Sequence, residues 1–280
     1  MFNQSLDKLI QRKNSLVCVG LDSDIHKIPK SLLSEMDPLY TFNKAIIEAT
    51  SDFAVAYKLN IAFYESLGIA GWELLERTLA IMPRGVLLIA DAKRADIENT
   101  ARKYAETFFT TYAFDAMTII PYMGMDSVTP FLEYEDKGVF LVTLSSNAGS
   151  TDFQFLKSDG IPLYQSVAQK AVEWNFLYGN CGLVVGGTHT TEIREIRDTA
   201  PDLPFLIPGI GAQGGNLEKV IEYATDPQGR AALINSSRTV IYASPERDFA
   251  EAAHSRAKQL RDQINVLITV HKNPGLLGQN

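Results

Sequence analysis

Short apolar runs recur along the whole chain, each about the length of a β-strand and most ending in a polar residue or glycine. They are rich in Val, Ile, Leu and Phe. None alternates cleanly between polar and apolar positions, as expected for strands of a parallel sheet that is covered on both faces. The eight runs span residues 15–22, 53–60, 85–93, 115–123, 138–146, 181–189, 204–211 and 231–238.

Between these runs the apolar positions repeat with helical spacing. The predicted helices cover about 38–51, about 64–80, a stretch that starts at Asp96, about 126–135, 162–178, 190–199, 216–224 and 246–270, and the first fourteen residues also form an amphipathic pattern. Eight strand-then-helix units predict an α/β protein with a (β/α)8 TIM-barrel fold. A doubly wound open sheet is the alternative, but eight regular repeats favour closure.

The 280 residues suit one large domain. No linker rich in Pro, Gly or Ser and no block of charge divides the chain. We therefore expect a single TIM-barrel domain over residues 1–280, with barrel strands at about 15–238 and a C-terminal helix at about 246–270. The longest irregular stretch, about 147–161, follows the fifth strand, which makes it a candidate mobile loop at the active-site face.

Composition narrows the function classes. The 26 Lys and Arg residues against 33 Asp and Glu residues give a net charge of -7, which argues against a nucleic-acid partner. The sequence contains no signal peptide pattern and no membrane-length apolar run, so we expect a cytoplasmic protein with no membrane contact. Cys18 and Cys181 lie in apolar runs and are expected to be buried thiols in a reducing compartment.

Neither a metal nor a cofactor site is predicted. None of the four histidines pairs with a second ligand at metal-binding spacing. Gly209, Gly211 and Gly214 match the pattern GxGxxG, but the match follows the seventh strand. A dinucleotide-binding fold carries this pattern after its first strand, so a nicotinamide site is not expected.

In a barrel of this kind, function lies at the carboxyl ends of the strands. A charged residue inside an apolar run is costly unless it is paired, and Lys58, Asp91 and Lys93 all stand in such runs. Asp91 and Lys93 are two residues apart and share a face, so with Lys58 they predict a chain of alternating charges. Asp96 either extends this chain or caps the following helix. Further polar strand ends are Asp22, Asn60, Ser145, Ser146, Asn147, Thr188, His189, Ser236, Ser237 and Arg238.

The ends of the seventh and eighth strands suit a phosphate group. The segment PGIGAQGG (208–215), which includes Gly211, offers backbone N–H groups that no side chains obstruct. Gln213 adds an amide and Arg238 adds a guanidinium fork. Barrels frequently bind phosphate at these two loops, although a plain flexible turn is the alternative.

The segment DAKRADIENT (91–100) resembles the signature of the orotidine 5'-phosphate decarboxylase family, Asp-x-Lys-x-x-Asp. Related barrel enzymes that act on sugar phosphates share this signature. The segments KLNIAFYE (58–65), PYMGMDSVTPF (121–131), GLVVGGTH (182–189) and PGIGAQGG resemble the longer bacterial branch of the decarboxylases. The resemblance extends from about Val17 to Arg238.

This resemblance implies a cofactor-free conversion of orotidine 5'-phosphate to UMP and CO2, the last step of de novo pyrimidine nucleotide synthesis. It implies that Lys93 protonates C6 of the pyrimidine and that Asp91 faces the substrate carboxylate. Lys58 would hold the charge network and a ribose hydroxyl. Asp96 and Thr100 would reach the site of the neighbouring subunit, which implies a homodimer.

The remaining implied contacts concern the substrate. The resemblance assigns Asp22 to the ribose and either Ser145 or Ser146 to the base. It assigns Gln213 and Arg238 to the phosphate, and Asn60 and Gly211 are further candidate substrate-binding residues at these strand ends.

Two departures and two rival functions accompany the resemblance. The branch often has Pro where Leu59 and Ala148 stand here, and neither change removes a proposed catalytic group. Aldolases or decarboxylases of the same fold use Mg²⁺, usually with an acidic residue at the end of the second strand. Lys58 occupies that place here and would repel a cation. The second rival is an inactive barrel that binds a nucleotide as a sensor.

Overall fold

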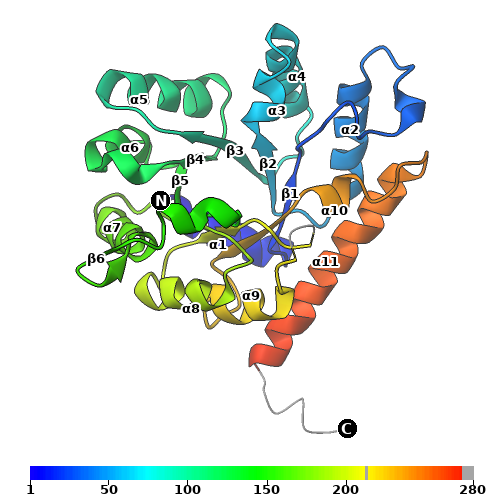
Figure 1. Ribbon diagram of the computed structural model, residues 1–280. Coiled ribbons are helices and arrows are strands. Elements are labelled where there is room, and N and C mark those ends of the chain that lie inside the picture. Colours follow the sequence, from blue (N-terminus) through cyan, green and yellow to red (C-terminus); the bar gives the residue numbers. More distant parts are fainter. Residues whose placement is uncertain (212–213, 273–280) are drawn as a thin grey trace, which may run out of the picture.

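Eight parallel strands close into a barrel in the computed structural model, which describes residues 1–211 and 214–272 (Figure 1). Neighbours in the barrel follow the order of the sequence, and the last strand pairs with the first. The closed order confirms the predicted barrel and rules out the open sheet. The strands are β1 (Val17–Gly20), β2 (Ala56–Asn60), β3 (Leu87–Arg94), β4 (Ala116–Ile119), β5 (Gly138–Leu144), β8 (Cys181–Val185), β9 (Phe205–Ile207) and β10 (Ala232–Ser236).

Helices connect consecutive strands and surround the barrel (Figure 1). They are α2 (Pro38–Thr50), α3 (Ile61–Glu65), α4 (Ile69–Ala80), α5 (Glu98–Ala105), α6 (Met125–Leu132), α7 (Leu163–Tyr178), α8 (Thr190–Thr199), α9 (Leu217–Ala224), α10 (Arg238–Ile241) and α11 (Phe249–Lys272). Short 3-10 turns, η1 (Lys30–Leu32) and η3 (Pro121–Met123), follow β1 and β4.

Helix α2 illustrates how the sequence sets these bounds. The Asp37 carboxylate accepts a hydrogen bond from the Tyr40 backbone N–H at 3.2 Å, and Pro38 occupies the first turn. Both features are typical of a helix start, because they satisfy or remove backbone donors that have no partner inside the helix. Phe42 and Ile46 are fully buried on the face toward the barrel, so capping and burial together fix the helix.

Two of the predicted helices differ from the structure. The stretch predicted at about 64–80 forms two helices, α3 and α4, because Gly68 between them has φ 64°, a left-handed value that ends a helix. The helix predicted from Asp96 begins at Glu98, since Ile97 before it is still extended. After α5 the chain continues as a π-helical segment, η2 (Glu106–Thr111).

The amino-terminal helix α1 (Phe2–Lys13) packs against the ends of strands at the opposite side from the site. Its buried face carries Phe2, Leu6 and Ile10, which confirms the amphipathic pattern. The Phe2 ring meets Phe140 edge-on at 6.3 Å between centroids. Gly138 makes this contact possible, because a Cβ there would lie 2.3 Å from the Phe2 ring.

The segment 147–161 contains structure that the sequence pattern did not predict. It holds a 3-10 turn, η4 (Ala148–Asp152), and a small antiparallel hairpin formed by β6 (Lys157–Ser158) and β7 (Ile161–Pro162). The hairpin ends at Pro162, one residue beyond this segment. The hairpin turn is Asp159–Gly160, with φ 51° and 81°, and both values suit a two-residue turn that favours Asp-Gly. That this segment is mobile stays a prediction.

The strands are buried on both sides, as the lack of alternation predicts. Every residue of β1, β8 and β10 is buried between the barrel interior and the surrounding helices. Cys18 and Cys181 are buried free thiols. Among the helices of the described residues, none is long and apolar enough to cross a membrane.

Candidate active site

A polar cavity of about 150 Å³ opens at the carboxyl ends of the barrel strands. Six of the residues predicted from sequence line it: Asp22, Lys58, Asn60, Asp91, Ser146 and Arg238. They come from β1, β2, β3, β5, β10 and the segments that follow these strands, so only closure of the barrel brings them together. A larger hollow of about 1000 Å³ lies beside α11 and contains none of the predicted site residues.

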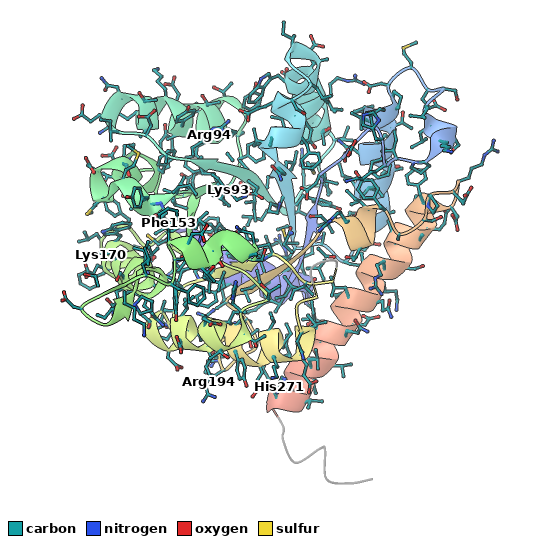
Figure 2. All side chains as sticks on the ribbon, viewed as in Figure 1. Lys93, Arg94, Phe153, Lys170, Arg194 and His271 are labelled. Atoms are coloured by element: carbon teal, nitrogen blue, oxygen red, sulfur yellow. The ribbon has the colours of Figure 1, made fainter. Side chains whose placement is uncertain are left out.

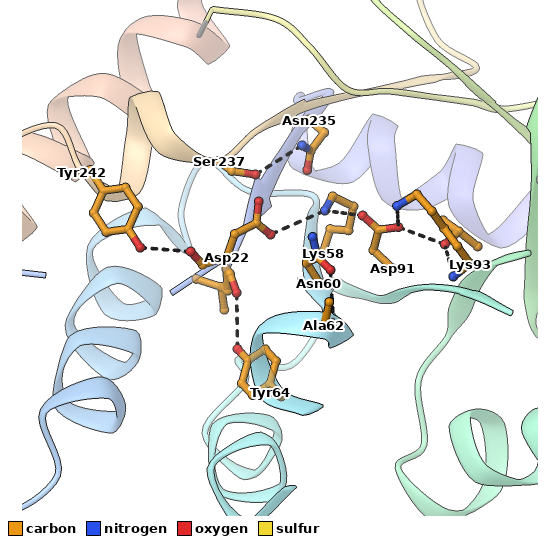
Figure 3. Close-up of polar contacts among 12 residues, drawn as sticks. Asp22, Lys58, Asn60, Ala62, Tyr64, Asp91, Lys93, Asn235, Ser237 and Tyr242 are labelled. Atoms are coloured by element: carbon orange, nitrogen blue, oxygen red, sulfur yellow. Dashed lines mark hydrogen bonds and ion pairs between the residues drawn. The ribbon is translucent and has the colours of Figure 1, made fainter. Parts of the chain in front are cut away.

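A chain of alternating charges runs from Asp22, Lys58 and Asp91, which line this cavity, to Lys93, which is not among its lining residues (Figure 3). The Lys58 ammonium donates to Asp91 Oδ2 at 2.8 Å and lies 3.7 Å from Asp22 Oδ1. The Lys93 ammonium donates to the other oxygen of Asp91, Oδ1, at 2.5 Å. The Thr118 hydroxyl also donates to Asp91 Oδ1, at 2.9 Å. Both oxygens of Asp91 are thus held, and the order of charges is the one expected from the sequence.

Burial makes this chain strongly coupled. The side chains of Lys58 and Asp91 are 5% and 10% exposed, whereas that of Lys93 is 49% exposed at the rim. Burial alone raises the pKa of Asp91, but attraction and hydrogen bonding by Lys58 and Lys93 outweigh it and hold the pKa well below its usual range. Burial alone lowers the pKa of Lys58, and the attraction of Asp91 and Asp22 reverses this and raises it. Asp91 and Lys58 are therefore both charged at neutral pH.

The backbone of β3 is irregular where it presents Lys93. Pairing with β4 is regular as far as Ala90 and then shifts before Arg94. Lys93 itself has φ 46°, and its N–H donates to the Thr118 hydroxyl at 3.1 Å. A left-handed backbone costs a residue other than glycine roughly 1–2 kcal/mol, and such strain is concentrated at functional sites. The Lys93 side chain, labelled in Figure 2, is 49% exposed, whereas the Asp91 side chain that it contacts is 10% exposed (Figure 3).

Hydroxyl groups from outside the barrel position the end of β1. The Tyr242 hydroxyl donates to the Asp22 carbonyl at 2.9 Å and accepts from the Asp24 N–H at 2.8 Å. The Tyr64 hydroxyl donates to the Leu21 carbonyl. On the next strand, the Asn60 side chain accepts from the Ala62 N–H and so caps α3 while it lines the cavity. The Asp22 carboxylate is consequently fixed beside Lys58.

The two serines at the end of β5 have different surroundings. Ser146 lines the cavity. Ser145 is bound to the following segment, because Gln154 accepts from its backbone N–H at 2.8 Å and donates to its hydroxyl at 2.8 Å. The Ser145 hydroxyl also reaches Asn147 at 2.6 Å. Of the two alternatives left open by the sequence, the geometry places Ser146 at the cavity.

The predicted phosphate end is only partly described. Arg238 begins α10 and lines the cavity, together with the backbone of Pro208, Gly209 and Ile210. Gly211 has φ 91° and faces a neighbouring hollow beside Thr239 rather than the cavity itself. Gln213 lies outside the described residues.

Asp96 and Thr100 stand apart from the cavity of their own chain. Neither is among its lining residues, and both lie on the segment that leads from β3 into α5. An Asp96 oxygen accepts from the Ile97 N–H, but the residue that caps α5 is Ile97, without a side-chain bond. Helix capping, the alternative role considered for Asp96, is therefore wrong.

Two cavity residues at the end of β10 were given no role from the sequence: Asn235 was not predicted, and Ser237 was noted only as a polar strand end. Asn235 is 6% exposed, and its carboxamide donates to the Ser237 hydroxyl at 3.4 Å (Figure 3). The alternation of side chains along a strand could have identified both residues from the sequence. If the side chain of residue 236 points outward, those of residues 235 and 237 point into the barrel. Ser236 accordingly does not line the cavity, and its hydroxyl contacts that of the lining residue Thr239.

Comparisons with known proteins identify the family that this chain resembles. The model of the "Orotidine 5'-phosphate decarboxylase / HUMPS family" matches residues 15–253. An orotidine 5'-phosphate decarboxylase of Dehalococcoides mccartyi (strain CBDB1) is 48% identical over 268 residues, covering 94% of this chain and 97% of the relative. One from Bacteroides fragilis (strain YCH46) is 46% identical, with the same coverage of each chain. The structure of Leishmania donovani OMP decarboxylase superposes with a TM-score of 0.84 at 37% identity, covering 96% of this chain and 100% of that one.

Proposed function

The chain belongs to the orotidine 5'-phosphate decarboxylase / HUMPS family, and from this premise we propose that it converts orotidine 5'-phosphate to UMP and CO2. The observation that carries the proposal is the chain of alternating charges Asp22–Lys58–Asp91–Lys93 at the carboxyl ends of the barrel strands, in which Lys58 and Asp91 are buried and Lys93 is exposed. It offers one ammonium, Lys93, to a reacting group while the buried carboxylate and lysine keep that ammonium in place.

The proposed reaction needs a fixed proton donor. When the bond between C6 and the carboxylate breaks, CO2 leaves and the electron pair remains on C6, where the ring π system cannot delocalise it. A preorganised ammonium stabilises this charge. Lys93 then transfers a proton to C6, which completes UMP, and the neutral amine takes up a proton from solvent. In this scheme no electron sink from a cofactor is required.

Asp91 has two roles in the proposal. Its two oxygens accept from Lys58 and Lys93, so it orients the proton donor. It also remains ionised, because the flanking ammonium groups lower its pKa. A fixed negative charge facing the substrate carboxylate disfavours the bound substrate more than the transition state, in which that charge has left as CO2.

The other cavity residues bind the nucleotide in this proposal. Asp22 and Lys58 face the ribose hydroxyls, with Asn60 beside them. Ser146 contacts the base. Arg238 binds the phosphate with Gln213, and the glycine-containing loop after β9 supplies backbone N–H groups. Binding energy from the phosphate, far from C6, holds the substrate for reaction.

A second subunit completes the proposed site. Asp96 and Thr100 do not line the cavity of their own chain, although they follow β3 directly. Next to them Ile97 is 48% exposed, and Tyr122 at the end of β4 is 84% exposed. Such exposed apolar groups support an apolar contact between two copies, through which Asp96 and Thr100 would reach the partner's site.

The proposal is tested by the fall in ultraviolet absorbance when the purified protein meets orotidine 5'-phosphate, with EDTA present and no cofactor added. We expect rapid loss of the orotate band. Lys93→Ala should abolish turnover while UMP still binds. Lys103→Ala should leave turnover unchanged, because Lys103 is an exposed lysine on α5 that pairs with Glu106 of η2.

Two results would contradict the proposal. A folded wild type that binds UMP without consuming orotidine 5'-phosphate would indicate a binding protein or another phosphosugar substrate. Turnover by Lys93→Ala within about tenfold of wild type would reject Lys93 as proton donor, since general acid catalysis contributes roughly 10²–10⁴-fold.

A further inference from the structure

The cavity wall formed by β10 carries two polar side chains, Asn235 and Ser237, to which the proposed function assigns no role. Both line the cavity beside Arg238. Asn235 is buried in the strand, and Ser237 is half-buried at the mouth, directly before Arg238. A ligand whose phosphate meets Arg238 therefore passes next to the Ser237 hydroxyl.

A glycine on the neighbouring strand makes room for this pair. Gly20 of β1 lies beside β10, and a Cβ at Gly20 would fall 1.9 Å from the Ser237 oxygen and 3.4 Å from Asn235 Oδ1. The hydroxyl thus occupies the space over β1 that any other residue would fill. On its other side Gly20 is paired in register with Lys58. The missing side chain places Ser237 within the mouth of the barrel.

The hydrogen bond between the pair determines what Ser237 can offer. The carboxamide nitrogen of Asn235 is a donor, so at 3.4 Å the Ser237 oxygen acts as the acceptor. The hydroxyl hydrogen then remains for another group, and within the described residues Ser237 donates it to no side chain or backbone atom. Asn235 Oδ1 is buried without a hydrogen-bond partner, a cost that native structures rarely carry without a functional reason.

We propose that Ser237 donates a hydrogen bond to the phosphate of the bound nucleotide and that Asn235 is a positioning residue that orients its hydroxyl. The inference rests on the proposed function, which supplies the phosphorylated ligand. A phosphate oxygen is the acceptor that this geometry fits, since Ser237 precedes Arg238 and lines the same cavity as the loop after β9. The Ser237 hydroxyl is a neutral donor whose hydrogen bond would fix the orientation of the phosphate, and Arg238 would supply the opposite charge.

The test compares binding of UMP and of uridine, which lacks the phosphate, by isothermal titration calorimetry. Ser237→Ala should weaken UMP binding by roughly 10- to 100-fold, the range for a hydrogen bond to a charged group. Uridine binding should be unchanged. Ser236→Ala is the matched control, because Ser236 is the adjacent residue but does not line the cavity, and its hydroxyl contacts that of Thr239.

Asn235 is tested through Ser237. Asn235→Ala should weaken UMP binding by a smaller factor, again without affecting uridine. The double variant should bind UMP no more weakly than Ser237→Ala, because the Asn235 effect needs the hydroxyl. With orotidine 5'-phosphate as substrate, both single variants should raise KM more than they lower kcat.

The possible outcomes separate the phosphate contact of Ser237, the positioning role of Asn235 and the proposed function. Unchanged UMP affinity in Ser237→Ala, or equal losses for UMP and uridine, would overturn the phosphate contact. Additive losses in the double variant would overturn the positioning role of Asn235. A wild type that fails to bind UMP would instead contradict the proposed function, and uridine binding by Ser237→Ala shows that the variant is folded.

Discussion

Asp91 is the residue on which the electrostatics of the site depend, because it is buried between two ammonium groups. A carboxylate whose pKa is lowered in the folded protein stabilises the fold above its ordinary pKa and loses that contribution as the pH falls. Lys58 is the opposite case. Because the pKa of Lys58 is raised in the folded protein, its charge stabilises the fold fully at pH values below the ordinary lysine pKa. This contribution is lost as the pH rises through the pKa that Lys58 has in the folded protein. Around neutral pH, the Asp91 and Lys58 charges therefore both contribute fully to the stability of the fold.

Asp91→Asn should therefore destabilise the protein, since it leaves the Lys58 charge buried without its main partner. We expect the free energy of unfolding at neutral pH to fall by about 3–5 kcal/mol, as for other broken buried pairs. The loss should shrink between about pH 6 and about pH 9, because a lysine whose folded pKa is lowered makes stability rise with pH. Urea unfolding at several pH values measures this.

Asp262→Asn is the control for that experiment, because Asp262 pairs with Lys258 and Arg261 on the exposed face of α11. Its effect on the free energy of unfolding should be small at every pH, because solvent screens an exposed ion pair. An Asp91→Asn protein as stable as wild type, with the same pH dependence, would show that Asp91 does not hold Lys58 in its charged form.

Arg238 carries the charge at the phosphate end of the cavity. Arg238→Ala should raise KM for orotidine 5'-phosphate by roughly 10- to 100-fold and leave uridine affinity unchanged, because the lost bonds go to a charged group. Steady-state kinetics and calorimetry measure the two effects. Arg256→Ala, which removes an exposed guanidinium bound to Gln259 on α11, should change neither. A normal KM for Arg238→Ala would place the phosphate elsewhere.

At the scale of elements, the end of β8 fixes the end of β5. The backbone of Gly186 passes so close that a Cβ would lie 2.7 Å from the Ser146 nitrogen and 2.8 Å from its Cα. The His189 ring, at the start of α8, reaches the Ser145 carbonyl at 3.1 Å. Ser146 therefore reaches the cavity only because β8 carries no side chain at residue 186.

Gly186→Ala should displace Ser146 and impair activity while the barrel still folds. Overpacking costs typically about 1–3 kcal/mol, and misplacing a contact by about 1 Å costs on the order of 10²-fold in rate. Turnover of orotidine 5'-phosphate and thermal unfolding measure the two effects. Thr188→Ala, an exposed position two residues later, is the control and should be neutral in both. Full activity of Gly186→Ala would show that the position of Ser146 is unimportant.

At the scale of the whole molecule, the site is proposed to combine residues of two subunits. Lys93→Ala and Asp96→Ala proteins should each be inactive, since each lacks a group of every site. After mixing and subunit exchange, a hybrid dimer would hold one site with both groups intact. About a quarter of wild-type activity is expected at full exchange, because half of the dimers are hybrids and each has one intact site of two.

Exchange is followed independently, by mass spectrometry of differently tagged subunits. No recovery of activity despite measured exchange would place Asp96 in the site of its own chain, and a monomer in solution would remove the shared site altogether. A mixture of Lys93→Ala and Asp91→Ala proteins is the control, because these two residues touch within one chain and no hybrid site holds both.

The sequence by itself determined the barrel and the charged side chains that pair at the carboxyl ends of its strands. Eight apolar runs without alternation indicate strands whose two faces are both buried. Such strands need helices on the outside and a closed barrel interior, or helices on both faces of a sheet. Lys58, Asp91 and Lys93 are recognisable because charge inside an apolar run demands a partner. Both signals are local, so they can be read from neighbours in the chain.

Only the tertiary structure decided which polar strand ends reach the cavity. The choice of Ser146 over Ser145 depends on Gln154 and on the close passage of Gly186. The exposure of Lys93 depends on a shift in pairing with β4, and the place of Ser237 on the empty position at Gly20. These outcomes arise from backbone approach between segments far apart in the chain, and such contacts exist only once the barrel has closed.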